Sequence, residues 1–117
     1  MKIIRFVEVK IQERPDGRTV RNLLQKELDM DVSGLQMLYV THPHGLEERQ
    51  HSHDHSCEIL YFLDKARYKI NGQDYLLNEN DVVLFEPGDI HGAIPIDNET
   101  RIIVFQSPII SDDKKYH

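Results

Sequence analysis

The sequence predicts an all-β fold, a sandwich or barrel. From residue 35 onward, about eight short runs rich in β-branched and aromatic residues follow one another, separated by turn sequences. Asn71-Gly72 lies between two such runs and is a strong hairpin signal, because both residues tolerate positive φ. The length of 117 residues suits one domain. We therefore expect one β-domain in which helices are scarce.

The expected strands can be placed in order along the chain. Their ranges are 35–41, 47–53, 57–63, 66–70, 73–77, 81–86, 91–96 and 100–107. The first third is less regular. Residues 3–9 fit a short strand, residues 13–18 carry the turn signal Pro-Asp-Gly, and residues 29–34 fit a loop. Residues 19–28 fit either a helical turn or a strand that leads into a loop.

These elements give an expected division of the chain. Residues 1–34 should form one or more strands and a loop that pack on a barrel, and residues 35–108 should form the barrel itself. Residues 109–117 should be a polar C-terminal tail. Its last stretch, SDDKKYH, is expected to be disordered because it carries almost no apolar side chain.

Charge and composition limit the classes of partner that the protein can have. The net charge of −6 and pI of about 5.6 disfavour nucleic acid, since phosphate binding needs a basic surface. No window has the roughly 18 to 20 apolar residues that span a bilayer, and the N-terminus lacks the apolar segment of a signal peptide. Cys57 is the only cysteine, which excludes an intramolecular disulfide and a cysteine zinc cluster. We expect a cytoplasmic protein without a membrane partner.

Metal-ligand residue types gather in RQHSHDHSCEILYFLD, residues 49–64. Successive side chains of a strand face opposite sides, so His51 and His53 share a face and can form half of a metal site. Glu58 opens the next strand and can face the two imidazoles. The turn at Pro87-Gly88 can aim His91 at the same point. Three imidazoles and one carboxylate suit Fe(II), Mn, Ni, Co, Cu(II) or Zn rather than Ca or Mg.

The spacing of these residues resembles the first motif of the cupin family, G-x5-H-x-H-x3–4-E-x6-G. Gly45, His51, His53 and Glu58 stand at the motif positions. The final glycine is replaced by Lys65. That position belongs to a turn, so the departure does not touch the ligand positions.

The second cupin motif, G-x5-P-x-G-x2-H-x3-N, is kept in part. Gly88 and His91 are in place, whereas Asn80, Glu86 and Pro95 stand where the family has glycine, proline and asparagine. The resemblance covers roughly residues 35 to 107. It implies a cupin-type double-stranded β-helix, or jelly-roll barrel, with one divalent transition metal held by His51, His53, Glu58 and His91.

Other polar residues near the motif have open roles. Arg49 shares the face of His51 and His53, so it can grip a substrate carboxylate, or it can lie past the barrel rim in solvent. His55 is expected in the loop before Glu58, exposed or at the site mouth. Cys57 should face away from Glu58. The remaining candidates are His42 and His44 as surface residues, His117 in the tail, and Tyr39, Phe62, Tyr68 and Phe85 as cavity-lining or core aromatics.

The run CEILYFL is apolar on both faces. A strand of a lone small barrel should have one polar face, so the outer face is expected to be covered by an N-terminal strand or by another subunit. We therefore expect a homodimer.

Two classes of function fit the resemblance. The first is a metalloenzyme that acts on a small oxygen-rich organic acid. Dioxygenase-like chemistry ranks first because the sequence shows no general base beside the metal, and isomerase chemistry with a Lewis-acid metal is the alternative. The second class is a non-catalytic module that binds a metal or a small ligand for sensing or storage. The fold alone does not decide between them.

Overall fold

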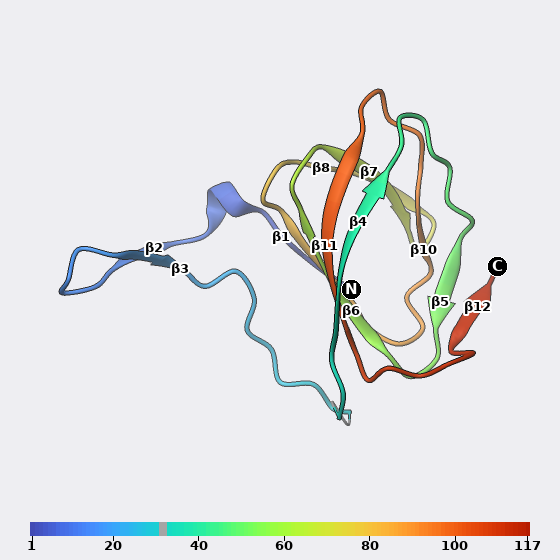
Figure 1. Cartoon of the computed structure of the whole chain (residues 1–117), viewed down its shortest axis with the longest axis horizontal. Helices are drawn as coiled ribbons and strands as arrows, with labels where there is room; N and C mark the ends of the chain where they lie inside the picture. The colour runs from blue at the N-terminus through green and yellow to red at the C-terminus, as the bar shows by residue number, and fades with distance from the viewer. Residues whose placement is uncertain (31–32) are drawn as a thin grey trace.

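Two antiparallel five-stranded sheets face each other in the structure, a computed structural model that describes residues 1–30 and 33–117 (Figure 1). This arrangement confirms the predicted all-β, double-stranded β-helix fold. The described chain has one short 3-10 helix, at Phe6–Glu8. Within these residues, no helix has the length and apolar character needed to cross a membrane.

Most consecutive strands of the barrel lie in opposite sheets. The first sheet has, in spatial order, β1 (Lys2–Ile4), β9 (Val82–Phe85), β6 (Cys57–Phe62), β11 (Thr100–Ser107) and β4 (Gln36–His42). The second has β12 (Lys114–Tyr116), β5 (His51–His53), β10 (His91–Ala93), β7 (Ala66–Ile70) and β8 (Gln73–Leu77). A separate hairpin joins β2 (Ile11–Glu13) and β3 (Thr19–Arg21).

Every strand expected between residues 35 and 107 is present, but β5 and β10 are shorter than expected. Residues 47–50 run beside β10 with irregular bonds: the Glu48 amide donates to the Ala93 carbonyl, and the Ala93 amide donates to the Glu48 carboxylate. Pro95 has no amide hydrogen to extend the ladder of β10.

The core lies between the two sheets. In β7, Tyr68 and Ile70 are buried, whereas Arg67 and Lys69 are exposed, as the alternation of a strand requires. The buried apolar cluster comprises Leu60, Phe62, Ala66, Tyr68, Ile70, Leu77, Val83, Phe85, Ala93, Ile102 and Val104. This core fixes the inner face on which the site is built.

The N-terminal segment is anchored at one end. Strand β1 pairs with β9, and the buried carboxylate of Asp81 accepts hydrogen bonds from the Arg5 guanidinium (2.8 Å) and the Phe6 amide (3.1 Å). The chain then leaves the barrel, and the β2–β3 hairpin extends to one side (Figure 1). Of the two readings of residues 19–28, the strand is right for Thr19–Arg21. Part of the loop expected over residues 29–34, residues 31–32, lies outside the described residues.

The expectation that the last residues are disordered is wrong. Lys114–Tyr116 form β12, which pairs with β5. Asp113 is buried, and its carboxylate accepts hydrogen bonds from the amides of His55 (3.0 Å) and Ser56 (2.9 Å). These bonds to a distant loop order a segment that has too little apolar surface to order itself.

Candidate metal centre

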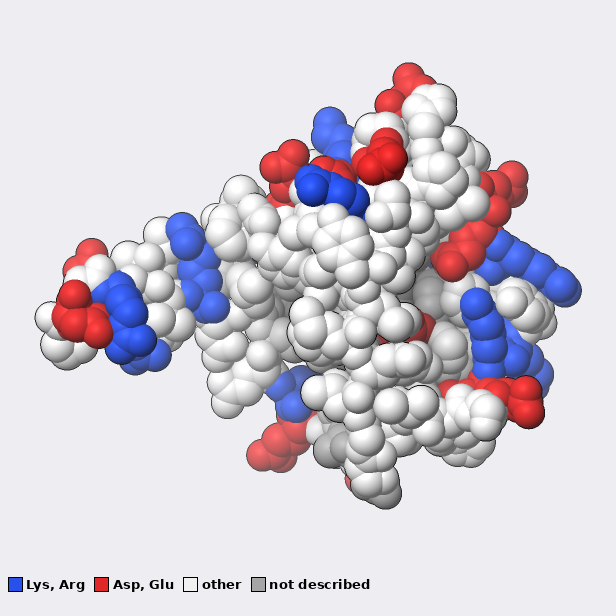
Figure 2. Space-filling view, in the orientation of Figure 1, with Lys and Arg blue, Asp and Glu red and all other residues white. Residues whose placement is uncertain are grey.

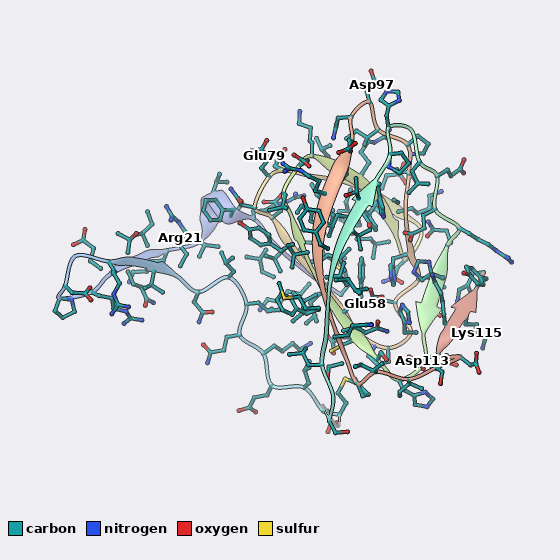
Figure 3. All side chains as sticks on the ribbon, in the orientation of Figure 1. Arg21, Glu58, Glu79, Asp97, Asp113 and Lys115 are labelled. Carbon is teal, nitrogen blue, oxygen red and sulfur yellow. The ribbon has the colours of Figure 1, made fainter. Side chains whose placement is uncertain are left out.

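Four of the sequence-predicted residues converge inside the barrel. His51 and His53 come from β5, His91 from β10 and Glu58 from β6 in the facing sheet. His51 lies directly opposite His91 in the antiparallel register. Each residue offers one ligand atom, and these four atoms all lie within 4.8 Å of one another. The labelled Glu58 lies between the sheets (Figure 3).

Backbone carbonyls set the orientation of two of the imidazoles. Nδ1 of His51 lies 2.9 Å from the carbonyl of Arg49, and Nδ1 of His91 lies 2.9 Å from that of Asp89. Because a carbonyl can only accept, each Nδ1 is the donor, and in a neutral imidazole Nε2 then has the free lone pair. The ring of His91 also stacks on Phe85, with 3.7 Å between centroids and an interplanar angle of 8°.

The Glu58 carboxylate lacks a hydrogen-bond partner although imidazoles surround it. Its Oε1 is buried and makes no hydrogen bond, yet lies 2.5 Å from His53 Nε2 and 3.5 Å from His91 Nε2. Burial would raise the pKa of Glu58, but the contacts with His53 and His91 outweigh it and lower this pKa to about 2. Burial also lowers the pKa of His51. An ionised carboxylate and three imidazoles around one point fit a divalent cation.

The departures from the cupin motifs are accommodated in turns. Asn80, which replaces a motif glycine, adopts a φ of 71°, a left-handed conformation that asparagine tolerates better than most residues. Gly88 keeps this conformation at φ 91°. Lys65 does not require positive φ, and its carbonyl accepts hydrogen bonds from Asn98 and Thr100. The turns therefore form without the family's glycines at positions 65 and 80.

The four residues open onto a cavity of about 360 Å³. Apolar side chains of β4, β6 and β11 form one wall: Leu38, Val40, Leu60, Ile102 and Val104. Further polar groups lie around it: His42, Glu48, Tyr68, Gln106 and Lys114. A small polar ligand in this space would meet the metal site on one side and these groups on the others.

Several of these cavity residues were missed or misplaced by sequence reasoning. Lys114 was assigned to a disordered tail, but it lies opposite His53 in the β12–β5 register. His42 was expected at the surface and is half-buried in the cavity wall. No local signal marks either one, because both placements depend on pairing between distant strands. Tyr39, expected in the cavity or core, is exposed, whereas Phe62 and Phe85 are buried in the core.

The remaining candidates lie outside the cavity. Arg49 is exposed, and its guanidinium lies over the Tyr116 ring, 4.6 Å from the centroid. His55 is exposed in its loop and donates to Asp113 through Nδ1 at 3.0 Å. Cys57 is buried, and its thiol donates to the Ser107 carbonyl.

The two other histidines have partners of their own. His44 is exposed and lies 2.8 Å from the Asp97 carboxylate, as suits a surface residue. His117 Nε2 lies 2.7 Å from the Ser52 hydroxyl, a contact that fixes the end of the tail.

Solved structures share this fold. KdgF from Halomonas sp. is 18% identical with a TM-score of 0.62, and the match covers 96% of this chain and 97% of that one. The DMSP lyase DddQ from Ruegeria pomeroyi DSS-3 is 22% identical with a TM-score of 0.63, over 71% of this chain but only 43% of the lyase. A cupin-superfamily sugar phosphate isomerase from Silicibacter pomeroyi DSS-3 is 13% identical with a TM-score of 0.58, over 66% and 52%. This chain thus spans about half or less of the lyase and the isomerase.

Because these structures are at most 22% identical to this chain, the likeness shows a shared fold and nothing about function. No curated protein matches the sequence. The sequence of residues 37–105, more than half of the chain, matches the Cupin domain family. Together with the double-stranded β-helix and the motif residues, this match shows that the chain belongs to the cupin family.

Proposed function

We propose that this chain is a metal-dependent enzyme that acts on a small oxygen-rich organic acid. One observation carries the proposal: four ligand atoms converge within 4.8 Å and open onto a cavity with further polar groups. A site that only stored a metal would not need these groups. Sensing or storage of a metal or small ligand remains the non-catalytic alternative.

His51, His53, Glu58 and His91 would hold one divalent transition metal, with Fe, Mn, Ni, Co, Cu and Zn as candidates. The donor set supports this, because it combines imidazole nitrogens and a carboxylate without thiolate. Bound there, the metal would polarise a substrate oxygen as a Lewis acid or, if redox-active, supply electrons.

Two reaction classes fit such a metal. Dioxygenase-like chemistry ranks first from the sequence, because no general base is visible beside the ligands. The cavity, however, contains His42, Glu48 and Tyr68, which can accept or donate protons. These groups favour proton transfer of the isomerase type over oxidation. The structural neighbours named above include a lyase and an isomerase, which agrees with chemistry of this type.

An anionic substrate would find a cation in the cavity. Lys114 lines the same space as the four ligand residues. Arg49, the substrate contact expected from the sequence, lines a different surface pocket and stays a candidate only for a substrate that reaches past the rim. We therefore propose Lys114 as the first contact for a substrate carboxylate.

A metal and substrate screen tests the proposed function. Purified protein would be loaded with each candidate metal and offered small hydroxy and keto acids, with oxygen uptake and NMR as readouts. We expect metal-dependent turnover that is lost in His51→Ala. Full turnover by His51→Ala protein stripped of metal would contradict the proposal. Oxygen consumption with a matched loss of substrate would favour dioxygenase-like chemistry over isomerisation.

We also propose that the protein works in the cytoplasm as a homodimer. A single buried cysteine is compatible with a reducing compartment. The dimer is supported by the outer face of β6 and β11, where Ile59, Tyr61, Ile103 and Phe105 are only half-buried. A surface pocket of about 710 Å³ lies between this face and the N-terminal arm, residues 10–24, which contains the β2–β3 hairpin.

A further inference from the structure

The side of the metal cavity formed by β4 and β7 holds a buried tyrosine hydroxyl without a partner. Tyr68 is 2% exposed, and its hydroxyl makes no hydrogen bond to any residue that the structure describes. Among the described residues, three side-chain atoms have neither solvent contact nor a hydrogen-bond partner: Gln50 Oε1, His53 Nδ1 and Glu58 Oε1. The Tyr68 hydroxyl is not among them, so it keeps an opening to the cavity that its side chain lines. A buried unpaired hydroxyl calls for an explanation, and a ligand in the cavity supplies one.

His42 lies beside this tyrosine. The two rings are stacked with 6.4 Å between centroids and an interplanar angle of 28°. The ring nitrogens of His42 also have no hydrogen-bond partner among residues 1–30 and 33–117. Burial lowers the pKa of His42, with an opposing effect of Glu48, so the imidazole is neutral near pH 7 and can accept a proton.

The charges around Tyr68 suit a proton donor. Burial, with the nearby carboxylates of Glu48 and Glu58, raises the pKa of Tyr68 well above its usual value. The phenol therefore stays protonated and can donate a hydrogen bond to an oxygen that becomes negative. Glu48 itself is held by the Ala93 amide, 3.1 Å from its Oε1.

We propose that His42 and Tyr68 are a catalytic proton-transfer pair, and that the substrates are small 2-hydroxy aldehydes and ketones, including those that also carry a carboxylate. This inference rests on the proposed function. A C–H bond next to the carbonyl breaks, and its proton goes to a ring nitrogen of His42. The electron pair forms the C=C bond, and the carbonyl π pair moves to the oxygen, which accepts a hydrogen bond from Tyr68. The neighbouring hydroxyl then gives its proton to this oxygen and becomes the new carbonyl, while His42 returns its proton to the former carbonyl carbon. The product is an isomer, so the step needs no oxidant.

The first test measures binding without turnover. Acetohydroxamate, a planar compound with two adjacent oxygens, mimics the enediolate that this step forms. Titration into Co(II)-loaded protein should give a dissociation constant that rises about tenfold in Tyr68→Phe, the loss expected for one hydrogen bond. Tyr75→Phe is the matched control, because Tyr75 faces Tyr68 in the β8–β7 register and does not line the cavity. Equal affinities in wild type and Tyr68→Phe would overturn the role of Tyr68.

The second test follows the proton. Dihydroxyacetone and glyceraldehyde in D₂O would be incubated with the metal-loaded protein, and loss of the C–H signal followed by NMR. We expect exchange in wild type, a loss of at least about a hundredfold in His42→Gln, and no change in His44→Gln, whose side chain is on the surface. Absence of exchange in wild type, or full exchange in His42→Gln, would overturn the pair.

The two tests separate this inference from the proposed function. A wild-type protein that binds neither metal nor hydroxamate would contradict the proposed function. A protein that binds both, with no effect of Tyr68→Phe or His42→Gln, would contradict only the proton-transfer pair. The His42 test does not depend on the folding of the buried Tyr68 variant.

Discussion

Gly92 packs closely against residues 48–50, the segment that leads into β5. It follows His91, and a Cβ built on it would meet Glu48 O at 2.8 Å and Gln50 Nε2 at 2.5 Å. Glu48 O is a backbone atom, so it cannot move away by a change of rotamer as the Gln50 side chain can. A side chain at this position would force β10 away from the segment that leads into β5, and so separate His91 from His51.

We therefore expect Gly92→Ala to lower both stability and metal affinity. The overpacking should cost about 1–3 kcal/mol in the free energy of unfolding, and metal affinity should fall at least about tenfold. Gly72→Ala is the control: its φ of 83° also makes alanine unfavourable, but nothing lies within 4 Å. Chemical denaturation and metal titration of both variants measure the two effects. Equal metal affinity in the two variants would contradict the close-approach argument.

Lys114 and Lys115 provide a matched pair on one strand. Neighbours on a strand face opposite sides, and Lys114, not Lys115, lines the cavity. If Lys114 contacts a substrate carboxylate, Lys114→Met should weaken binding of oxalate to the metal-loaded protein about tenfold, or about 1.4 kcal/mol. Calorimetric titration of Lys115→Met should give the wild-type dissociation constant. An equal effect of both substitutions would point to general electrostatics instead.

At this scale, the sequence predicts the cluster of His51, His53, Glu58 and His91 better than the rest of the cavity. The four ligand types stand at recognisable spacings, and strand alternation separates Glu58 from Cys57. By contrast, His42 enters the cavity only because β4 pairs with β11 at the edge of the sheet. That pairing joins segments about sixty residues apart, and no local pattern encodes it.

At the scale of elements, one buried carboxylate holds β12 on the barrel. Burial would raise the pKa of Asp113, but hydrogen bonds from the Ser56 and His55 amides and the His55 ring outweigh it and lower this pKa below its usual 3.8. A depressed pKa contributes stability above the usual value, and this stability is lost as the pH falls through the folded-state pKa.

Asp113→Asn should therefore loosen β12 at neutral pH, because it removes the charge and one of the two acceptor oxygens. Hydrogen exchange measured by mass spectrometry should show faster exchange of residues 114–116, with little change in β6 and β11. In metal-free wild type, contacts between Lys114 and His53 seen by NMR should fade below about pH 3.8. Unchanged protection of residues 114–116 in Asp113→Asn would contradict the anchoring role.

The sequence predicts the central elements and fails at the two ends for one reason. Strands between residues 35 and 107 show alternation and turn residues such as Asn71-Gly72, which are local signals. Strand β12 has three exposed residues and forms through contacts with β5, far away in the chain. The β2–β3 hairpin has a local signal, the Pro-Asp-Gly turn. Its direction away from the barrel has none, because that direction depends on contacts outside the hairpin.

At the scale of the whole molecule, the N-terminal arm and the outer face of β6 and β11 are two surfaces that a second copy of the chain can cover. The hairpin pairs with no other strand that the structure describes, and isolated two-stranded hairpins are marginal in water. The surface between the arm and the barrel carries few charges in the view of Figure 2. A second copy could cover both features reciprocally about a two-fold axis.

Light scattering with size exclusion tests this dimer. We expect wild type at twice 13.7 kDa and Phe105→Glu, on the outer face of β11, at the monomer mass. Leu76→Glu is the control, since Leu76 is 48% exposed on β8, at the edge of the other sheet. A wild-type mass of 13.7 kDa at micromolar concentration would contradict the dimer.

The metal content of the purified protein tests whether the four clustered residues form a metal site. Wild-type protein should bind one divalent transition metal per chain at pH 7.5, and occupancy should fall as the pH is lowered and protons compete with the metal for the imidazoles. His53→Ala should lose the metal, whereas His55→Ala, two residues further along and outside the cluster, should keep it. Elemental analysis by mass spectrometry after dialysis decides the outcome. Stoichiometric metal in His53→Ala protein would contradict the account.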